Sequence, residues 1–167
     1  MPDSNVTDGR TDGCALQVLT LGLGGEIFAL ESAQVREVLD MVELTEVPGA
    51  RSFVKGLVNV RGKVVPVVDL KTKFDMPALP PTEDSRIVVI EVSRNGEDSM
   101  VGVLTDRVLE VTELPQATLE DVPRVGMTWQ PDFIRAIGKR DGDFVIVMDI
   151  AAIFSSEGPG GRRKTQP

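Results

Sequence analysis

The sequence predicts a mainly β protein in which two small barrels of about five strands each pack against one another, with few and short helices. Three observations favour this fold. The chain repeats part of itself, and its short apolar runs are separated by tight-turn signals. With six Phe, one Trp and no Tyr in 167 residues, its core must also be largely aliphatic.

An internal repeat aligns residues 53–74 with residues 133–154 without a gap. Six of the 22 aligned positions are identical, namely Phe53/Phe133, Gly62/Gly142, Val65/Val145, Val67/Val147, Asp69/Asp149 and Phe74/Phe154. The match extends backwards with gaps in the links, pairing Leu19 with Ile90, Leu21 with Val92, Ala29 with Gly102 and Val35 with Val108. Units of about 65 residues bury little core alone, so the two copies should pack together and form a groove.

The first copy begins with two strands and a third extended segment. Partial alternation of apolar residues predicts a strand over 16–23, and Gly24-Gly25 suits a tight turn into a second strand over 26–30. Residues 36–44 are a third extended candidate. A hairpin over 58–68 follows, because an Arg-Gly pair separates two apolar runs there.

The second copy shows the same plan. Apolar runs over 87–92 and 100–104 flank an Asn95-Gly96 turn signal, and residues 108–113 are again extended. The hairpin over 134–148 has an Asp-Gly pair at its turn, which is a strong two-residue turn signal.

Short helices are expected at two kinds of place. Ala50–Lys55 and Pro131–Ala136 are candidates for single helical turns, one in each copy. Asp69 and Asp149 each follow an apolar run and precede a possible helical turn, where a carboxylate accepts hydrogen bonds from free backbone N–H groups. We therefore interpret the repeated Asp as a helix cap rather than a catalytic group.

Composition also indicates where the ordered region begins and ends. The polar segments 1–13 and 156–167 are predicted to be disordered tails. Residues 14–155 form the predicted domain, with approximate subdomains 14–80 and 81–155 joined by a Pro-rich link.

Charge and residue usage argue against several function classes. The formal net charge of −8 disfavours nucleic-acid binding. The chain has no His, and its single cysteine, Cys14, has no internal disulfide partner. We therefore expect a reducing, cytoplasmic location and no metal or cofactor. No apolar run is long enough for membrane insertion.

A search for catalytic constellations finds none. The sequence has no phosphate-binding Gly-rich loop, nucleophile elbow or cysteine pair. The acidic pairs Glu43/Glu46 and Glu120/Asp121 lie in polar, turn-like contexts that are typical of a solvated surface. An enzyme with an acidic site remains an alternative, and loss of turnover on a single carboxylate substitution would identify it.

Residues 48–74 resemble the signature region of the CheW family of chemotaxis coupling proteins. The family pattern is a Phe-hydrophobic-Lys/Arg-Gly element, then Asn-hydrophobic-Arg-Gly, an apolar strand with an internal Pro, and Asp-Leu. The matching residues are Phe53, Lys55, Gly56, Asn59, Arg61, Gly62, Pro66, Asp69 and Leu70. Residues 28–38 and 100–111 resemble further family stretches, so the resemblance spans 15–155.

The resemblance implies two packed SH3-like barrels and a non-enzymatic adaptor without cofactors. Such an adaptor links the cytoplasmic hairpin of a methyl-accepting chemoreceptor to the regulatory domain of a CheA-type histidine kinase. It is expected in the cytoplasm at membrane-associated receptor arrays, without membrane insertion and without a nucleic-acid partner. Alternatives are an adaptor of a chemosensory-like pathway that controls pili or gliding, and a piece of a larger protein fused to a response-regulator receiver.

Two binding surfaces follow from the same resemblance. The receptor-binding residues would be Val35, Glu37, Gly56, Arg61, Ile87, Gly102, Val108 and Val111. The kinase-binding residues would be Leu44, Val47, Leu119 and Val125. In the family Arg61 pairs with Glu37, and both are present here. The chain departs from the family at Glu120 and Val125, where a basic residue and an aromatic are frequent, and this leaves a second, ring-forming kinase interface open.

Overall fold

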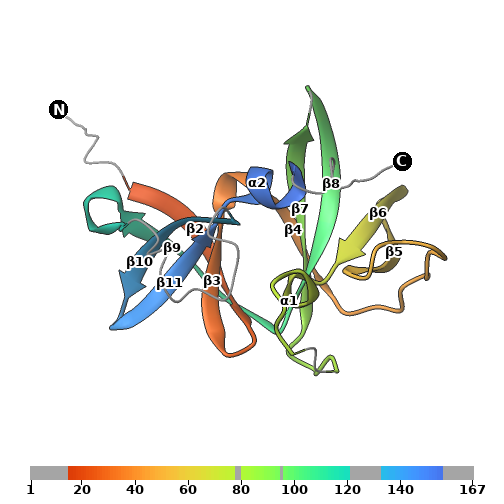
Figure 1. Ribbon diagram of the computed structural model, residues 1–167, viewed down its shortest axis with the longest axis horizontal. Helices are drawn as coiled ribbons and strands as arrows, with labels where there is room; N and C mark the ends of the chain where they lie inside the picture. Colours follow the sequence, from red (N-terminus) through yellow and green to blue (C-terminus); the bar gives the residue numbers. More distant parts are fainter. Residues whose placement is uncertain (1–14, 78–79, 95, 121–132, 156–167) are drawn as a thin grey trace.

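The computed structural model describes residues 15–77, 80–94, 96–120 and 133–155, and strands dominate it (Figure 1). The strands are β2 (Ala15–Leu23), β3 (Glu26–Glu31), β4 (Val35–Asp40), β5 (Val54–Val60), β6 (Lys63–Val68), β7 (Arg86–Arg94), β8 (Glu97–Thr105), β9 (Arg107–Pro115), β10 (Ile134–Arg140) and β11 (Asp143–Met148). The helices are α1 (Leu70–Lys73) and α2 (Ile150–Ser155), with 3₁₀ turns at Ser32–Gln34 and Gln116–Thr118. The predicted tails lie outside the described residues.

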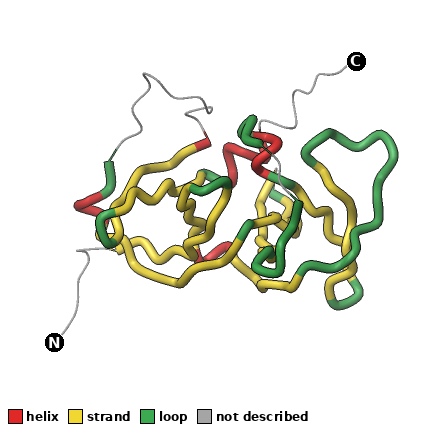
Figure 2. The backbone as a smooth tube through the Cα atoms, turned by 90° about the horizontal axis from the view of Figure 1, so that it is seen from below, coloured by secondary structure: helices red, strands yellow, loops and turns green. Residues whose placement is uncertain are grey.

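The ten strands of the described residues form two five-stranded sheets, which we call the β2 sheet and the β7 sheet. The β2 sheet has the order β10-β11-β3-β2-β9, and the β7 sheet has the order β4-β7-β8-β6-β5. Each sheet curls into a small barrel, and the two barrels lie side by side (Figure 2). The predicted fold class, two packed barrels with few short helices, is confirmed.

The two copies of the repeat exchange hairpins. Hairpin β2–β3 of the first copy joins β9, β10 and β11 of the second, while hairpin β7–β8 of the second copy joins β4, β5 and β6 of the first. The chain crosses between the sheets at Ser32–Gln34 and again at Asp106. Each barrel therefore contains residues from both expected segments, 14–80 and 81–155, so the unit of the repeat differs from the unit of the fold.

Strand registers correct one part of the sequence alignment. Leu21 lies opposite Val108 in the β2 sheet, and Ile90 lies opposite Val35 in the β7 sheet. Since Val35 and Val108 are equivalent, Leu21 corresponds to Ile90 and not to Val92. The alignment was two residues out of register because a shift of two leaves the inward-facing pattern of a strand unchanged.

The tight turns form as predicted. Arg61 has a φ of 53° and Gly62 a φ of 86°, and Asp141 and Gly142 have φ values of 53° and 85°. Gly24 and Gly25 likewise have positive φ, at 60° and 88°. Positive φ at both central residues defines the type I′ turn, whose twist suits a two-residue hairpin.

Helix caps are confirmed, whereas the two early helical turns are not. A carboxylate oxygen of Asp69 accepts the backbone N–H of Lys71 at 3.0 Å, and Asp149 accepts that of Ala152 at 3.0 Å. The predicted helical turn over Ala50–Lys55 is wrong, because residues 52–53 turn directly into β5. The predicted turn over Pro131–Ala136 is wrong from Ile134, where β10 begins, and residues 131–132 lie outside the described part of the chain.

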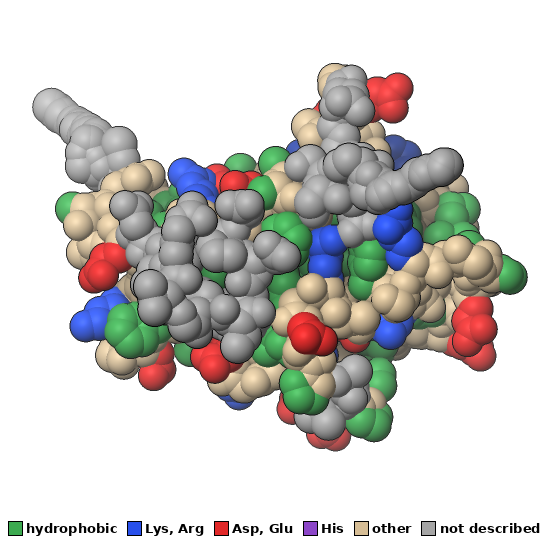
Figure 3. All heavy atoms as spheres, in the orientation of Figure 1, with side chains coloured by type: hydrophobic (Ala, Val, Ile, Leu, Met, Phe, Trp, Pro, Cys, Tyr) green, Lys and Arg blue, Asp and Glu red, His purple; other side chains and the backbone are tan. Residues whose placement is uncertain are grey.

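The core consists of two barrel interiors and a larger central cluster between the sheets. Short aliphatic residues such as Val18 and Val147 fill one interior, and Val67 and Val89 belong to the other. The central cluster draws on both sheets and both copies of the repeat. On the face in Figure 3, apolar side chains reach the surface between the two barrels.

Aromatic side chains gather in the central cluster. The rings of Phe28 and Phe74 stack at 5.7 Å, and Phe74 lies 6.0 Å from Phe133. The ammonium group of Lys73 lies 4.7 Å from the ring centre of Phe53 and 5.3 Å from that of Phe133. The repeated Phe53 and Phe133 are thus buried as predicted, and one cation contacts both rings.

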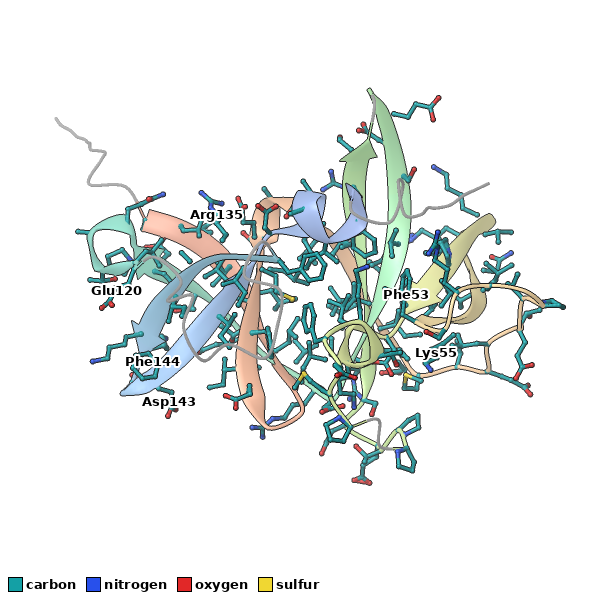
Figure 4. All side chains as sticks on the ribbon, in the orientation of Figure 1. Phe53, Lys55, Glu120, Arg135, Asp143 and Phe144 are labelled. Carbon is teal, nitrogen blue, oxygen red and sulfur yellow. The ribbon has the colours of Figure 1, made fainter. Side chains whose placement is uncertain are left out.

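We predict that Phe133→Ala lowers the free energy of unfolding by about 3–5 kcal/mol, because it opens a cavity in the shared cluster. Urea unfolding followed by circular dichroism measures the change. Phe144 is the matched control, because it is 63% exposed and lies at the tip of the β10–β11 hairpin (Figure 4). Phe144→Ala should change stability by about 0.5 kcal/mol or less, and equal losses for both variants would contradict a shared core.

Candidate partner-binding surfaces

Both barrels close across a gap between their edge strands. In the β7 sheet, Thr45 and Leu57 exchange two backbone hydrogen bonds, at 3.0 and 2.8 Å, which join the segment after β4 to β5. In the β2 sheet, Glu120 and Ile137 do the same at 2.9 Å each, joining the segment after β9 to β10. The gap carries an ion pair in each barrel, and one of these pairs contains the predicted receptor-binding arginine.

Arg61 and Glu37 form the expected pair. Arg61 Nε donates to Glu37 Oε1 at 3.0 Å, and Nη2 donates to Oε2 at 3.5 Å. The side chain of Arg61 is 81% exposed and that of Glu37 is 24% exposed. Hydrogen bonding to Glu37 raises the pKa of the Arg61 guanidinium above its ordinary value. The pair therefore fixes the direction of a charged side chain at the surface.

The second barrel has a related pair, in which Arg140 Nε lies 3.3 Å from Glu110 Oε2. Glu110 is the repeat equivalent of Glu37, but Arg140 lies one position before Asp141, the equivalent of Arg61. The sequence did not single out this second pair.

Four valines on the edge strands face the central cluster. Residues directly opposite in an antiparallel pair point to the same side of the sheet. Val35 and Val38 on β4 lie opposite Ile90 and Val88, both members of the central cluster. Val108 and Val111 on β9 lie opposite Leu21 and Leu19 of β2, which also belong to the central cluster. We call Val35, Val38, Val108 and Val111 the edge valines.

Of these edge valines, Val35 and Val108 pack partly against the central cluster, while Val38 and Val111 are exposed. Three of the four were predicted from the resemblance, and Val38 was missed. Its equivalence to Val111 in the repeat is the signal that identifies it.

Three predicted receptor residues do not reach the surface. Ile87 is fully buried inside the β7 barrel, and a Cβ on Gly102 would come within 2.8 Å of its Cγ2 atom. A Cβ on Gly56 would lie 2.7 Å from the carbonyl oxygen of Thr45. Gly102 and Gly56 are therefore required by internal packing and by barrel closure.

The predicted kinase residues divide in the same way. Leu44 packs partly into the interior of the β7 barrel, and Leu119 packs into that of the β2 barrel, where its Cδ2 atom would lie 3.1 Å from a Cβ on Gly138. Val47 is exposed, and so is Val42, which the sequence reasoning missed. In the segment 41–47, these two valines therefore face solvent while Leu44 packs into the interior of the β7 barrel.

Val125 and Asp121 lie outside the described residues, and Glu120, the departure from the family pattern, is exposed beside Leu119. Glu43 and Glu46 are exposed, in keeping with a solvated surface. Among the residues with described positions, no group of three or more His, Cys, Asp or Glu could hold a metal. In the same part of the chain, no helix is long and apolar enough to cross a membrane.

Comparisons with known proteins agree with this architecture. The family model of the CheW-like domain matches residues 17–158. The chemotaxis protein CheW of Treponema pallidum is 26% identical over 141 residues, which cover 84% of this chain and 83% of that protein. Protein PilI of Pseudomonas aeruginosa is 30% identical over 125 residues, covering 74% of this chain and 67% of PilI.

A solved structure is similar as well. The crystal structure of the scaffolding protein TtCheW from Thermoanaerobacter tengcongensis superposes with a TM-score of 0.75 at 30% identity, covering 84% of this chain and 88% of that one. The likeness therefore extends over nearly the whole described fold, including both barrels.

We predict that Gly102→Ala costs about 1–3 kcal/mol of stability, because the new methyl group overlaps the branched Cγ2 of Ile87. Ile87→Leu removes that branch at equal volume, so the double variant should recover about 1 kcal/mol in a double-mutant cycle of urea unfolding. Gly22→Ala is the control, because its methyl would meet only the flexible side chain of Arg107, at 3.1 Å. Additive losses would show that Ile87 and Gly102 do not pack as described.

Proposed function

The chain belongs to the CheW-like domain family, and from this we propose that it is a non-enzymatic scaffold that couples the cytoplasmic tips of chemoreceptors to a CheA-type histidine kinase. The observation that carries the proposal is the family match over residues 17–158, nearly the full described fold. The test is reconstitution: the purified chain should raise receptor-dependent autophosphorylation of the kinase. Failure to bind either partner would refute the proposal.

The receptor site in this proposal is the edge of the central cluster. Val35 and Val38 on β4, together with Val108 and Val111 on β9, give apolar contact on strands from both barrels. A chemoreceptor tip is a helical hairpin, and an amphipathic helix binds through its apolar face to a hydrophobic groove. Gly56, Ile87 and Gly102 support this site from inside the fold and do not contact the receptor.

Arg61 gives the receptor site its polar specificity. Glu37 holds the guanidinium by two hydrogen bonds, so the arginine reaches a partner in one orientation. Oriented charges at the rim of an apolar contact select among partners more than they raise affinity.

The kinase site in this proposal is the loop that closes the β7 barrel. Val42 and Val47 are its exposed apolar residues, while the Thr45–Leu57 hydrogen bonds and the close approach to Gly56 hold the loop in place. Leu119 and Glu120 occupy the equivalent closing segment of the other barrel and form the second proposed contact, together with Val125.

The similarity to PilI supports a second candidate, an adaptor in a chemosensory-like pathway that controls pili. Both functions use the same surfaces and place the protein in the cytoplasm at receptor arrays, as one domain over residues 14–155. Identifying the receptor and kinase that co-purify with the chain from its own cells separates them.

For the receptor site, we predict that Arg61→Glu weakens binding of a receptor cytoplasmic fragment about tenfold or more. The new carboxylate has the wrong charge for the partner, and Glu37 repels it from the position that the guanidinium occupies. Adding Glu37→Arg should recover part of the loss. Isothermal titration calorimetry gives the affinities, and thermal unfolding should differ little between variants because Arg61 is exposed. If Arg61→Glu binds the receptor fragment with normal affinity, the receptor does not contact the β5–β6 turn.

For the kinase site, we predict that Val47→Asp weakens binding of the kinase regulatory domain at least about tenfold while the protein keeps its stability to within about 0.5 kcal/mol. Val64→Asp is the matched control, since Val64 is also exposed but lies outside the closing loop. Leu44→Asp should instead lower stability by about 2 kcal/mol or more, because it puts a carboxylate into the barrel interior. Normal kinase binding by Val47→Asp would locate the interface elsewhere.

A further inference from the structure

An ion pair with a buried lysine joins the two barrels at one of the two places where the chain crosses between sheets. Among the described residues, Lys71 in α1 is the one Lys or Arg that is buried. Its Nζ atom lies 2.6 Å from Oδ1 of Asp106, and the two side chains are 6% and 38% exposed. Burying an ammonium group is unfavourable unless a partner holds it, so this contact needs an explanation.

Asp106 holds three elements together. It is the single residue between β8 of the β7 sheet and β9 of the β2 sheet. Its Oδ2 atom accepts the backbone N–H of Gly24 at 2.7 Å, and its own N–H donates to the carbonyl of Gly22 at 2.9 Å. The Lys71–Asp106 pair therefore ties the helix after β6 to the β2–β3 turn of the other barrel.

The same turn also packs against the segment that follows α1. A Cβ on Gly24 would come within 2.4 Å of the terminal methyl of Met76, and Met76 in turn packs against the central cluster. Polar and apolar contacts thus hold the β2–β3 turn against the other barrel at this crossover.

The other crossover lacks this arrangement. In the repeat, Ala151 stands where Lys71 stands, and Ala33 stands where Asp106 stands. An open depression of about 260 Å³ lies there, with both alanines in its lining. The chain therefore has an ionic tie at one crossover, whereas alanines stand at the equivalent positions of the other, beside the polar side chains of Arg36, Glu91 and Asp98.

We propose that Lys71 and Asp106 are positioning residues that fix the angle between the barrels and thereby the spacing of the edge valines. Asp106 directly precedes β9, and Val108 is the second residue of that strand, so holding Asp106 also holds the start of β9. The valines of β4 follow the crossover without the ion pair, where α2 packs against β7, so Lys71 and Asp106 set the position of the β9 valines relative to them. This inference rests on the proposed receptor site.

The first test measures the angle without any partner. Spin labels at Lys63→Cys and Asp143→Cys, in a Cys14→Ser background, report the distance between hairpin tips of the two barrels. The wild-type pair should give one narrow distance distribution, and Lys71→Met should broaden or shift it. Arg135→Met is the control, because it removes an ion pair with Glu31 that lies within the β2 sheet, and it should leave the distribution unchanged.

The second test measures affinity for each partner. If the competent angle falls to about a tenth of the population in Lys71→Met, binding of the receptor fragment weakens about tenfold. Binding of the kinase regulatory domain through the Val42–Val47 loop should stay unchanged, because that loop lies within one barrel and the second, ring-forming contact at Leu119 and Glu120 would engage a different kinase molecule. Lys71→Arg keeps the charge and should bind the receptor fragment with nearly the wild-type affinity. If Lys71 served stability alone, Lys71→Met would lower the free energy of unfolding and would not weaken receptor binding more than kinase binding.

An unchanged distance distribution in Lys71→Met overturns the proposal, and so does equal weakening toward both partners. Should Lys71→Met fail to fold, Lys71→Gln keeps a hydrogen-bond donor without the charge and is measured in the same way. If the wild-type chain does not bind the receptor fragment, the proposed function fails, while the spin-label distances still decide whether the pair sets the angle.

Discussion

The central hydrophobic cluster between the two sheets is the contact on which the rest of the structure depends. Neither copy of the repeat contains it, because each sheet combines a hairpin from one copy with three strands from the other. Parallel pairing joins the copies where Phe28 lies opposite Ile146 and where Gly102 lies opposite Val67. Separating the barrels would expose the cluster, and separating the copies would break both sheets. Small barrels with little interior volume gain their stability in this way.

The alternation of side chains along the strands decides which residues remain for partners. Most positions of the central strands face a barrel interior or the shared cluster, and exposed exceptions such as Val64 and Phe144 lie beside the hairpin turns. Ile87 and Gly102 illustrate this, since the resemblance assigned both to receptor binding and both are used in packing. Apolar contact with a partner is left to edge strands and closing loops, where Val38, Val111 and Val47 are exposed. A motif residue is therefore evidence for fold or for binding only once its face is known.

Local features of the fold were predictable from the sequence, and long-range ones were not. The hairpin turns and the caps at Asp69 and Asp149 depend on neighbouring residues, so their signals are complete in short segments. Hairpin exchange leaves no local signal, because a strand has the same pattern whichever barrel it joins. The helical turn expected at Ala50–Lys55 failed for a tertiary reason, since the carbonyl of Phe53 accepts the N–H of Asp69 beyond the next hairpin. The Arg61–Glu37 pair came from the family resemblance alone.

The differences between the copies matter for function as much as their likeness. The repeat specifies two barrels that close in the same way, by backbone hydrogen bonds at equivalent places. Identical surfaces would bind one kind of partner twice, whereas a scaffold that links two proteins needs unlike ends. The β5–β6 and β10–β11 hairpin turns meet this need, because Arg61 in the first and Asp141 in the second share a φ of 53° and carry opposite charges. Arg140 stands directly before Asp141, so the second turn combines both charges where the first has an arginine alone, and two turns of the same shape differ in the charges that they offer.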